Sequence, residues 1–150
     1  MIRKSLSPAD GTLDDAEASS NAYYRALDLG RMDEAEVLLE RALAAETVPE
    51  MMRSQILLEA AFFHAYFRRD AEKARTLFYE SQPGKVLDKH LPARTKAAIL
   101  LAEGDAGGAG KEARESLDRL GESLNAGTAK LEREWLGKML EHLIQERSTR

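Results

Sequence analysis

Three short turns of similar sequence recur along this chain, and they constrain its fold more than any other feature. They occupy residues 30–35, 69–74 and 104–109. Aligning them places Ala35, Ala74 and Ala109 in register, at spacings of 39 and 35 residues. Four positions after these alanines come Leu39, Phe78 and Ala113, of which two are larger than alanine. Three positions further on come the small residues Ala42, Ser81 and Ser116. Small side chains at these offsets let the second helix of a hairpin lie close against the first.

The segments between the turns have helical character. Ala, Leu, Glu, Lys and Arg dominate them, and apolar residues recur with helical spacing, whereas alternating β-branched runs are missing. The sequence therefore predicts an all-α fold of about three helical hairpins, followed by a C-terminal helix. We expect a flexible N-terminal segment over residues 1–12 and one helical domain over residues 13–147. The predicted hairpins cover about 13–46, 47–82 and 92–120, and the last helix covers about 128–145.

Capping signals set the ends of these helices. Gly30 and Gly104 tolerate the left-handed conformation that ends a helix. The run Thr47-Val48-Pro49-Glu50 predicts the start of a third helix that continues to about Arg69, and Asp70 predicts the start of the fourth. Because residues 105–110 are glycine-rich, we expect the sixth helix to start late or to fray.

The repeated pattern resembles the tetratricopeptide repeat. The first unit, Gly-Arg-Met-Asp-Glu-Ala-Glu over residues 30–36, followed by Leu39, Ala42 and Leu43, carries the resemblance best. The resemblance covers about residues 13–120 and implies a right-handed superhelical array. Where the family prefers a small residue facing the neighbouring helix, this chain has Tyr23 and Phe62, which implies a divergent and repacked version.

The last predicted helix has an apolar stripe on one side. The stripe consists of Leu131, Trp135, Leu136, Met139, Leu140, Leu143 and Ile144, with charged residues such as Glu132 elsewhere. A terminal helix of a repeat array covers the apolar face of its neighbour and presents a polar face to water. We therefore interpret this helix as a cap and Trp135 as a core residue.

Composition argues against several classes of function. The 22 basic and 26 acidic residues give a net charge of −4, and they are mixed along the chain without the basic stripe of a nucleic-acid-binding protein. There is no cysteine, which excludes disulfides and zinc–thiolate sites and fits a cytoplasmic location. No segment of the sequence approaches the ~20 apolar residues of a membrane span, so we expect no direct insertion into a membrane.

The sequence also predicts no catalytic site, cofactor or metal. His64, His90 and His142 do not form a zinc-binding motif, and His64 is interpreted as a partly buried, hydrogen-bonded residue. Residues 104–110 lack the Gly-Lys-Ser/Thr ending of a phosphate-binding loop. An enzyme remains an alternative only if the fold brings His64, Glu59 and Glu80 together in one pocket.

Residues 56–67 are the most informative segment for function, because they are apolar nearly all round. Burial between two neighbouring hairpins explains much of this pattern. The resemblance also implies that the first helix of each hairpin lines a concave groove. The candidate partner-binding residues are then Tyr24, Leu27, Asp28, Glu59, Phe63, Tyr66, Phe67 and Arg94. Aromatic side chains beside charges are typical of binding hot spots, but the sequence leaves open whether Phe63, Tyr66 and Phe67 are exposed.

These observations favour an adaptor, a module that binds a peptide or helix of another protein in the groove. The first alternative is a structural module that forms a homodimer through the same aromatic residues. The second rests on residues 64–70, which resemble the helical soluble regions attached to membrane-embedded site-2-type peptidases. That resemblance implies an accessory role beside membrane machinery, although the chain has neither the span nor the zinc motif of those enzymes.

Overall fold

The computed structural model describes residues 13–45, 48–83, 90–118, 130 and 132–141. In these ranges the chain forms six bounded helices and a last helix over residues 130 and 132–141, with no strand, which confirms the all-α prediction. The predicted flexible segment 1–12 lies outside the described residues, as do the two ends of the predicted last helix. The six helices are α1 (Leu13–Asp28), α2 (Met32–Ala44), α3 (Glu50–Tyr66), α4 (Ala71–Ser81), α5 (His90–Ala102) and α6 (Ala106–Asp118).

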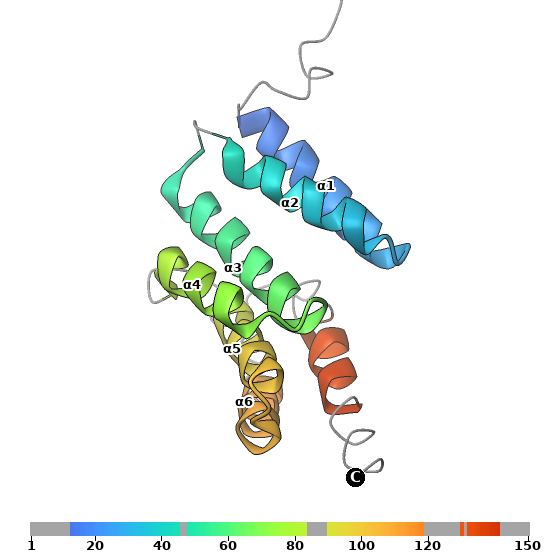
Figure 1. Cartoon of the computed structure of the whole chain (residues 1–150), viewed down its shortest axis with the longest axis vertical. Coiled ribbons are helices and arrows are strands. Elements are labelled where there is room, and N and C mark those ends of the chain that lie inside the picture. Colours follow the sequence, from blue (N-terminus) through green and yellow to red (C-terminus); the bar gives the residue numbers. More distant parts are fainter. Residues whose placement is uncertain (1–12, 46–47, 84–89, 119–129, 131, 142–150) are drawn as a thin grey trace, which may run out of the picture.

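The helices pack as consecutive hairpins. α1 packs on α2, α3 on α4 and α5 on α6, and α3 also packs along α5 (Figure 1). The first and third hairpins turn at glycines in the left-handed conformation, Gly30 with φ +72° and Gly104 with φ +86°. The residue after each glycine donates a backbone hydrogen bond to the preceding helix. The Arg31 N–H donates to the Ala26 carbonyl and the Asp105 N–H to the Leu100 carbonyl, both with an N···O distance of 2.9 Å. Both turns are therefore Schellman motifs, and the predicted glycine ends are confirmed.

The middle turn differs from the prediction. α3 begins at Glu50 and ends at Tyr66, three residues before the predicted Arg69. Arg69 adopts φ +56° without being glycine, which lets the Asp70 N–H donate to the His64 carbonyl at 2.9 Å. The Asp70 carboxylate then accepts the Lys73 N–H at 3.1 Å, so its predicted role as the cap of α4 is confirmed.

The repeated small residues lie where the hairpin helices cross. Ala35, Ala74 and Ala109 are buried, as are Ala42, Ser81 and Ser116. Of the three residues between them in the pattern, Leu39 and Ala113 are buried and Phe78 is half-buried. The sequence repeat is therefore a packing repeat, in which small side chains allow the close approach of the second helix.

The glycine-rich start of α6 corrects an expectation. The helix begins at Ala106, immediately after the turn, and does not start late. The Asp105 carboxylate accepts the Gly108 N–H at 2.9 Å, and this cap compensates for the poor helix propensity of the glycines. Gly110 and Ala109 are buried, so the small residues also serve the packing of α6.

This cap yields a matched pair of predictions. A Cβ added at Gly107 would lie 3.9 Å from the nearest atom of Asp105, whereas one at Gly108 would lie 2.5 Å from its Oδ2. We expect Gly107→Ala to raise the free energy of unfolding by about 0.5 kcal/mol. Gly108→Ala displaces the capping carboxylate and should lower it by up to about 1 kcal/mol. Urea unfolding monitored by circular dichroism measures both values, and equal shifts in one direction would contradict the cap.

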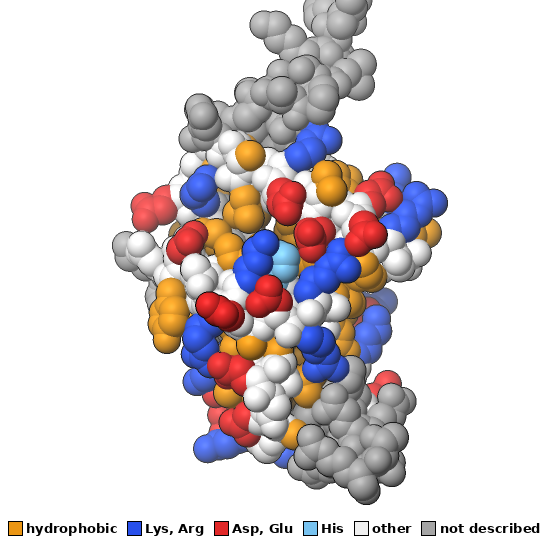
Figure 2. Space-filling view, viewed as in Figure 1, with side chains coloured by type: hydrophobic (Ala, Val, Ile, Leu, Met, Phe, Trp, Pro, Cys, Tyr) orange, Lys and Arg blue, Asp and Glu red, His pale blue; other side chains and the backbone are white. Residues whose placement is uncertain are grey.

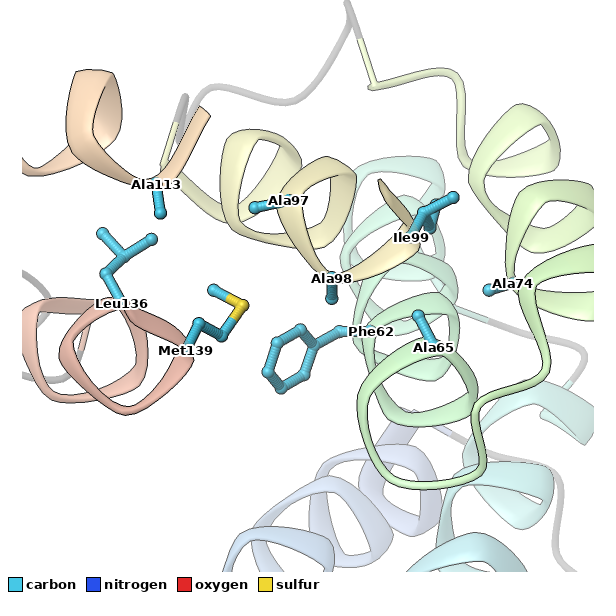
Figure 3. Close-up of a cluster of buried hydrophobic side chains, with 9 residues drawn as sticks. All are labelled: Phe62, Ala65, Ala74, Ala97, Ala98, Ile99, Ala113, Leu136 and Met139. Carbon is cyan, nitrogen blue, oxygen red and sulfur yellow. The ribbon is translucent and has the colours of Figure 1, made fainter. Parts of the chain in front are cut away.

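The core surrounds α3. One cluster contains Phe62 and Ala98 with Leu136 and Met139 of the last helix (Figure 3). A second cluster, which includes Phe63, joins α3 to the first hairpin. Phe62 and Phe63 thus point into different clusters, which explains why α3 is apolar nearly all round.

No helix in the described part of the chain is long and apolar enough to span a membrane.

Candidate functional site

Three charged side chains from distant parts of the sequence meet inside the fold. Arg94 on α5 is 2% exposed, and its Nη2 donates to Oε1 of Glu59 on α3 at 2.8 Å. On the other side, Arg94 Nε lies 2.9 Å from Oε2 of Glu132 on the last helix. That contact is an ion pair in which the N–H is not aimed well enough for a hydrogen bond. Glu59, Arg94 and Glu132, which we call the buried ion cluster, therefore link two hairpins to the last helix.

The first hairpin joins this cluster through Tyr24. Its hydroxyl donates to Glu59 Oε1 at 3.1 Å, and its side chain is 36% exposed. Burial, and then the charge of Glu59, raise the pKa of Tyr24 well above its usual range, so the hydroxyl remains a donor. Burial alone would lower the pKa of Arg94, but the carboxylates of Glu59 and Glu132 hold it above its usual value. A continuous polar path therefore runs from α1 through α3 and α5 to the last helix.

Tyr23, beside Tyr24, differs from it in burial and in hydrogen bonding. Its side chain is fully buried, and its hydroxyl has no hydrogen-bond partner among the described residues. Burial, followed by the charge of Glu59, raises the pKa of Tyr23. An unsatisfied buried hydroxyl costs stability, whereas a hydroxyl bonded to a carboxylate contributes to it.

The two tyrosines therefore give a second matched pair. We expect Tyr24→Phe to lower the free energy of unfolding by about 1 kcal/mol, because Glu59 loses a donor. Tyr23→Phe removes only the unpartnered hydroxyl, so its effect should lie between zero and about 1 kcal/mol of stabilisation. Chemical denaturation measures both, and a greater loss in the Tyr23 variant would contradict the assigned contacts.

Aromatic rings surround the cationic end of the cluster. The Arg94 guanidinium lies 4.2 Å from the Phe62 ring centroid, within the range of a cation–π contact. Trp135 of the last helix packs its ring 5.2 Å from Phe62, 6.0 Å from Tyr66 and 5.7 Å from Phe67. The last helix thus lies against α3 and α5 through Glu132, Trp135, Leu136 and Met139.

The predicted site residues separate into two groups. Phe63 is 0% exposed, and its ring lies 6.2 Å from Tyr23 and 5.6 Å from Phe67, so it is a core residue and cannot contact a partner. Glu59 and Arg94 are also buried, because each neutralises the other. The first result answers the question that the sequence leaves open for Phe63, and the second corrects the expectation that Glu59 and Arg94 are accessible in the groove. The residues that retain some exposure are Tyr24, Leu27, Asp28, Tyr66 and Phe67.

Sequence reasoning missed Glu132 as a site residue. The pattern of the last helix places Glu132 away from the apolar stripe, but its side chain is 3% exposed and lies next to Arg94. Its position three residues before Trp135 places both on one face of a helix, which is the only sequence signal for its role. Trp135 is half-buried, at the junction between the core and the surface.

The residues that could have formed a catalytic pocket do not converge. Glu59 contacts Tyr24 and Arg94, whereas the charges acting on His64 are those of Lys73, Glu36, Asp70 and Arg68. Glu80 is exposed on α4. In the described ranges, no group of three or more His, Asp or Glu side chains is arranged to hold a metal ion.

His64 instead predicts a dependence of stability on pH. Its side chain is 6% exposed, and burial, followed by the charge of Lys73, lowers its pKa below 6.5. The unfolded chain therefore binds a proton at a higher pH than the folded chain, so stability falls as the pH drops below about 6.5. His64→Gln should reduce this slope of the free energy of unfolding against pH, which thermal melts between pH 7 and about 5 would measure. An unchanged slope would contradict the burial of a neutral imidazole.

On the face seen in Figure 2, Lys and Arg side chains are interspersed with Asp and Glu, and hydrophobic side chains lie between them. This face shows no extended patch of charges of one sign.

Comparisons of the chain with family models, with curated proteins and with solved structures give no match.

Proposed function

We propose that this chain is an adaptor that binds a helix or peptide of another protein along the face formed by α1, α3 and α5. In this proposal the three hairpins are divergent tetratricopeptide-like units in a superhelical array. The absence of cysteine fits action in the cytoplasm. The observation that supports the proposal most is that a helix, the last helix of the chain itself, already lies on part of this face.

The contacts of the last helix follow a known mode of helix recognition. Glu132, Trp135, Leu136 and Met139 stand at positions i, i+3, i+4 and i+7, which is the spacing of an amphipathic helix in an apolar groove. Leu136 and Met139 are buried, and Glu132 pairs with Arg94. The face therefore has the apolar surface and the charge that helix binding requires.

Beside the last helix, the part of the face nearer α1 retains accessible side chains. Tyr24 is 36% exposed, Leu27 and Phe67 are half-buried, and Asp28 is exposed. Aromatic residues at the edge of a packed core are enriched in binding hot spots, because they bury a large area at a small cost in side-chain entropy. We place the first contact of the partner here.

Affinity purification with variants tests this assignment. The double variant Tyr24→Ser/Leu27→Ser changes the proposed face, and Val37→Ser/Tyr79→Ser is its control, since Val37 and Tyr79 are 55% and 68% exposed on α2 and α4. We expect a protein that co-purifies with the wild type and the control, but not with the Tyr24 variant. Circular dichroism confirms that all three chains are folded.

Two other results would contradict the proposal. A partner retained by both double variants, or lost from both, would place binding elsewhere. A wild-type dimer that needs no partner and that the Tyr24 variant dissociates would favour the homodimer, and light scattering measures the mass that decides this.

A further inference from the structure

We infer that the surface beneath the last helix is an exchangeable docking site, in which an amphipathic helix of a partner can replace the chain's own helix. The partner helix would carry an acidic residue at a position i, an aromatic residue at i+3, and aliphatic residues at i+4 and i+7. This inference rests on the proposed function, and it specifies the chemistry of the partner. It is carried by three properties of the surface and of the helix that lies on it.

First, the charged end of the surface is organised by residues outside the last helix. Arg94 is held by Glu59 at 2.8 Å and by the face of Phe62 at 4.2 Å. Tyr24 in turn donates to Glu59, so that carboxylate is fixed from the first hairpin. A guanidinium positioned in this way can pair with any carboxylate that a docking helix brings to the place of Glu132.

Second, the apolar end combines small side chains with rings. Ala97 and Ala98 on α5 and Ala113 on α6 face Leu136 and Met139, and their small size leaves room for the larger side chains of the helix (Figure 3). Tyr66 and Phe67 receive the indole of Trp135 at ring-centroid distances of 6.0 and 5.7 Å. The surface therefore distinguishes the positions of an aromatic and an aliphatic residue along a docked helix.

Third, the described residues of the last helix that pack on the fold lie on one face of it. The described residues on its other side are exposed, namely Lys130, Arg133, Glu134, Lys138 and Glu141. Among these, Lys138 contacts Trp135 of the same helix, with its Nζ 4.8 Å from the ring. A helix held by one face opens at a lower free energy than a hairpin core that is packed on several sides. A partner helix with the same pattern can then satisfy the same contacts.

The test uses the 150-residue chain, in which Trp135 is the only tryptophan. A synthetic peptide with the sequence of residues 128–145 and the change Trp135→Phe is titrated into it, so that all tryptophan emission comes from the protein. Displacement moves Trp135 away from the rings of Phe62, Tyr66 and Phe67 and into water. We expect a saturable red shift of the emission while the far-ultraviolet circular dichroism of the protein is retained.

A second peptide that also carries Glu132→Lys is the matched control. It places a positive charge beside Arg94, and we expect its affinity to be at least about tenfold lower. A fluorophore on each peptide reports binding independently through anisotropy. The inference is overturned if neither the emission nor the anisotropy changes, if the two peptides act equally, or if the labelled peptide binds without shifting Trp135.

The outcomes separate this inference from the proposed function. A partner that depends on Tyr24 and Leu27 but does not shift the emission of Trp135 would retain the adaptor and overturn the exchange. Exchange of the peptide, with no partner captured by any variant, would support the docking site and contradict the adaptor.

Discussion

Replacing Arg94 with alanine is expected to lower the free energy of unfolding by about 3–5 kcal/mol, which is a large part of the stability of a domain of this size. The change leaves the carboxylates of Glu59 and Glu132 buried without their cation, and removing one partner of a buried pair is far more costly than never having the pair. It also removes the contact between the guanidinium and Phe62. Urea unfolding at neutral pH measures the loss.

The pH dependence of this loss identifies its cause. Burying a carboxylate without a cation is costly while the carboxylate is ionised, and protonation removes that cost. Protonation therefore favours the folded variant, so the deficit should be greatest at neutral pH and should shrink as the pH falls toward about 4. A deficit independent of pH would mean that lost packing, not uncompensated charge, destabilises the variant.

Arg75→Ala provides the matched control. Arg75 Nη2 pairs with Glu103 at 2.6 Å, a shorter contact than either contact of Arg94, but both side chains are partly exposed. An exposed pair of this kind contributes at most about 1 kcal/mol. Equal losses for the two variants would contradict the account, because burial is the property that distinguishes them.

Phe62→Ala should destabilise the chain by about 3–5 kcal/mol, for a different reason. The Phe62 ring is fully buried where α3, α5 and the last helix meet (Figure 3). The centroid of the Trp135 ring lies 5.2 Å from that of Phe62. Removal of the Phe62 ring leaves a cavity that the neighbouring helices cannot fill without moving. Because Trp135 loses a contacting ring, its emission should shift to the red while the chain is still folded.

Two controls define the outcome for Phe62. Tyr79→Ala on α4 removes a ring that is 68% exposed, and it should change stability by no more than about 0.5 kcal/mol. Phe62→Leu fills most of the space and should cost less than Phe62→Ala. A loss below about 1 kcal/mol for Phe62→Ala would show that the last helix does not depend on this contact.

Local features of the fold could be predicted from the sequence because their causes are local. Gly30 and Gly104 end helices through their own backbone conformation, and Asp70 caps the helix that it precedes. Ala35 and Ala74 could be recognised as crossing points because the packing repeats at nearly constant spacing. The glycines of α6 misled the prediction, because the cap from Asp105 outweighs their low propensity.

The site was harder to predict because its contacts join residues far apart in the sequence. Glu59 and Arg94 are separated by 35 residues, and nothing in their local pattern indicates that they pair. The pattern of its own helix predicts that Glu132 is a surface residue, whereas in the fold it is buried next to Arg94 of α5. Phe62 and Phe63 are indistinguishable by composition, and only the positions of the neighbouring helices assign each ring to its cluster.

Hydrogen exchange on the chain with and without its co-purified partner tests the central claim most directly. We expect slower exchange in α1, around Tyr24 and Leu27, and from the C-terminal half of α3 to Phe67. Exchange should become faster over residues 132–141 as the last helix is displaced. Slower exchange confined to α2 and α4 would contradict the claim, because the partner would then bind the opposite helices of the hairpins.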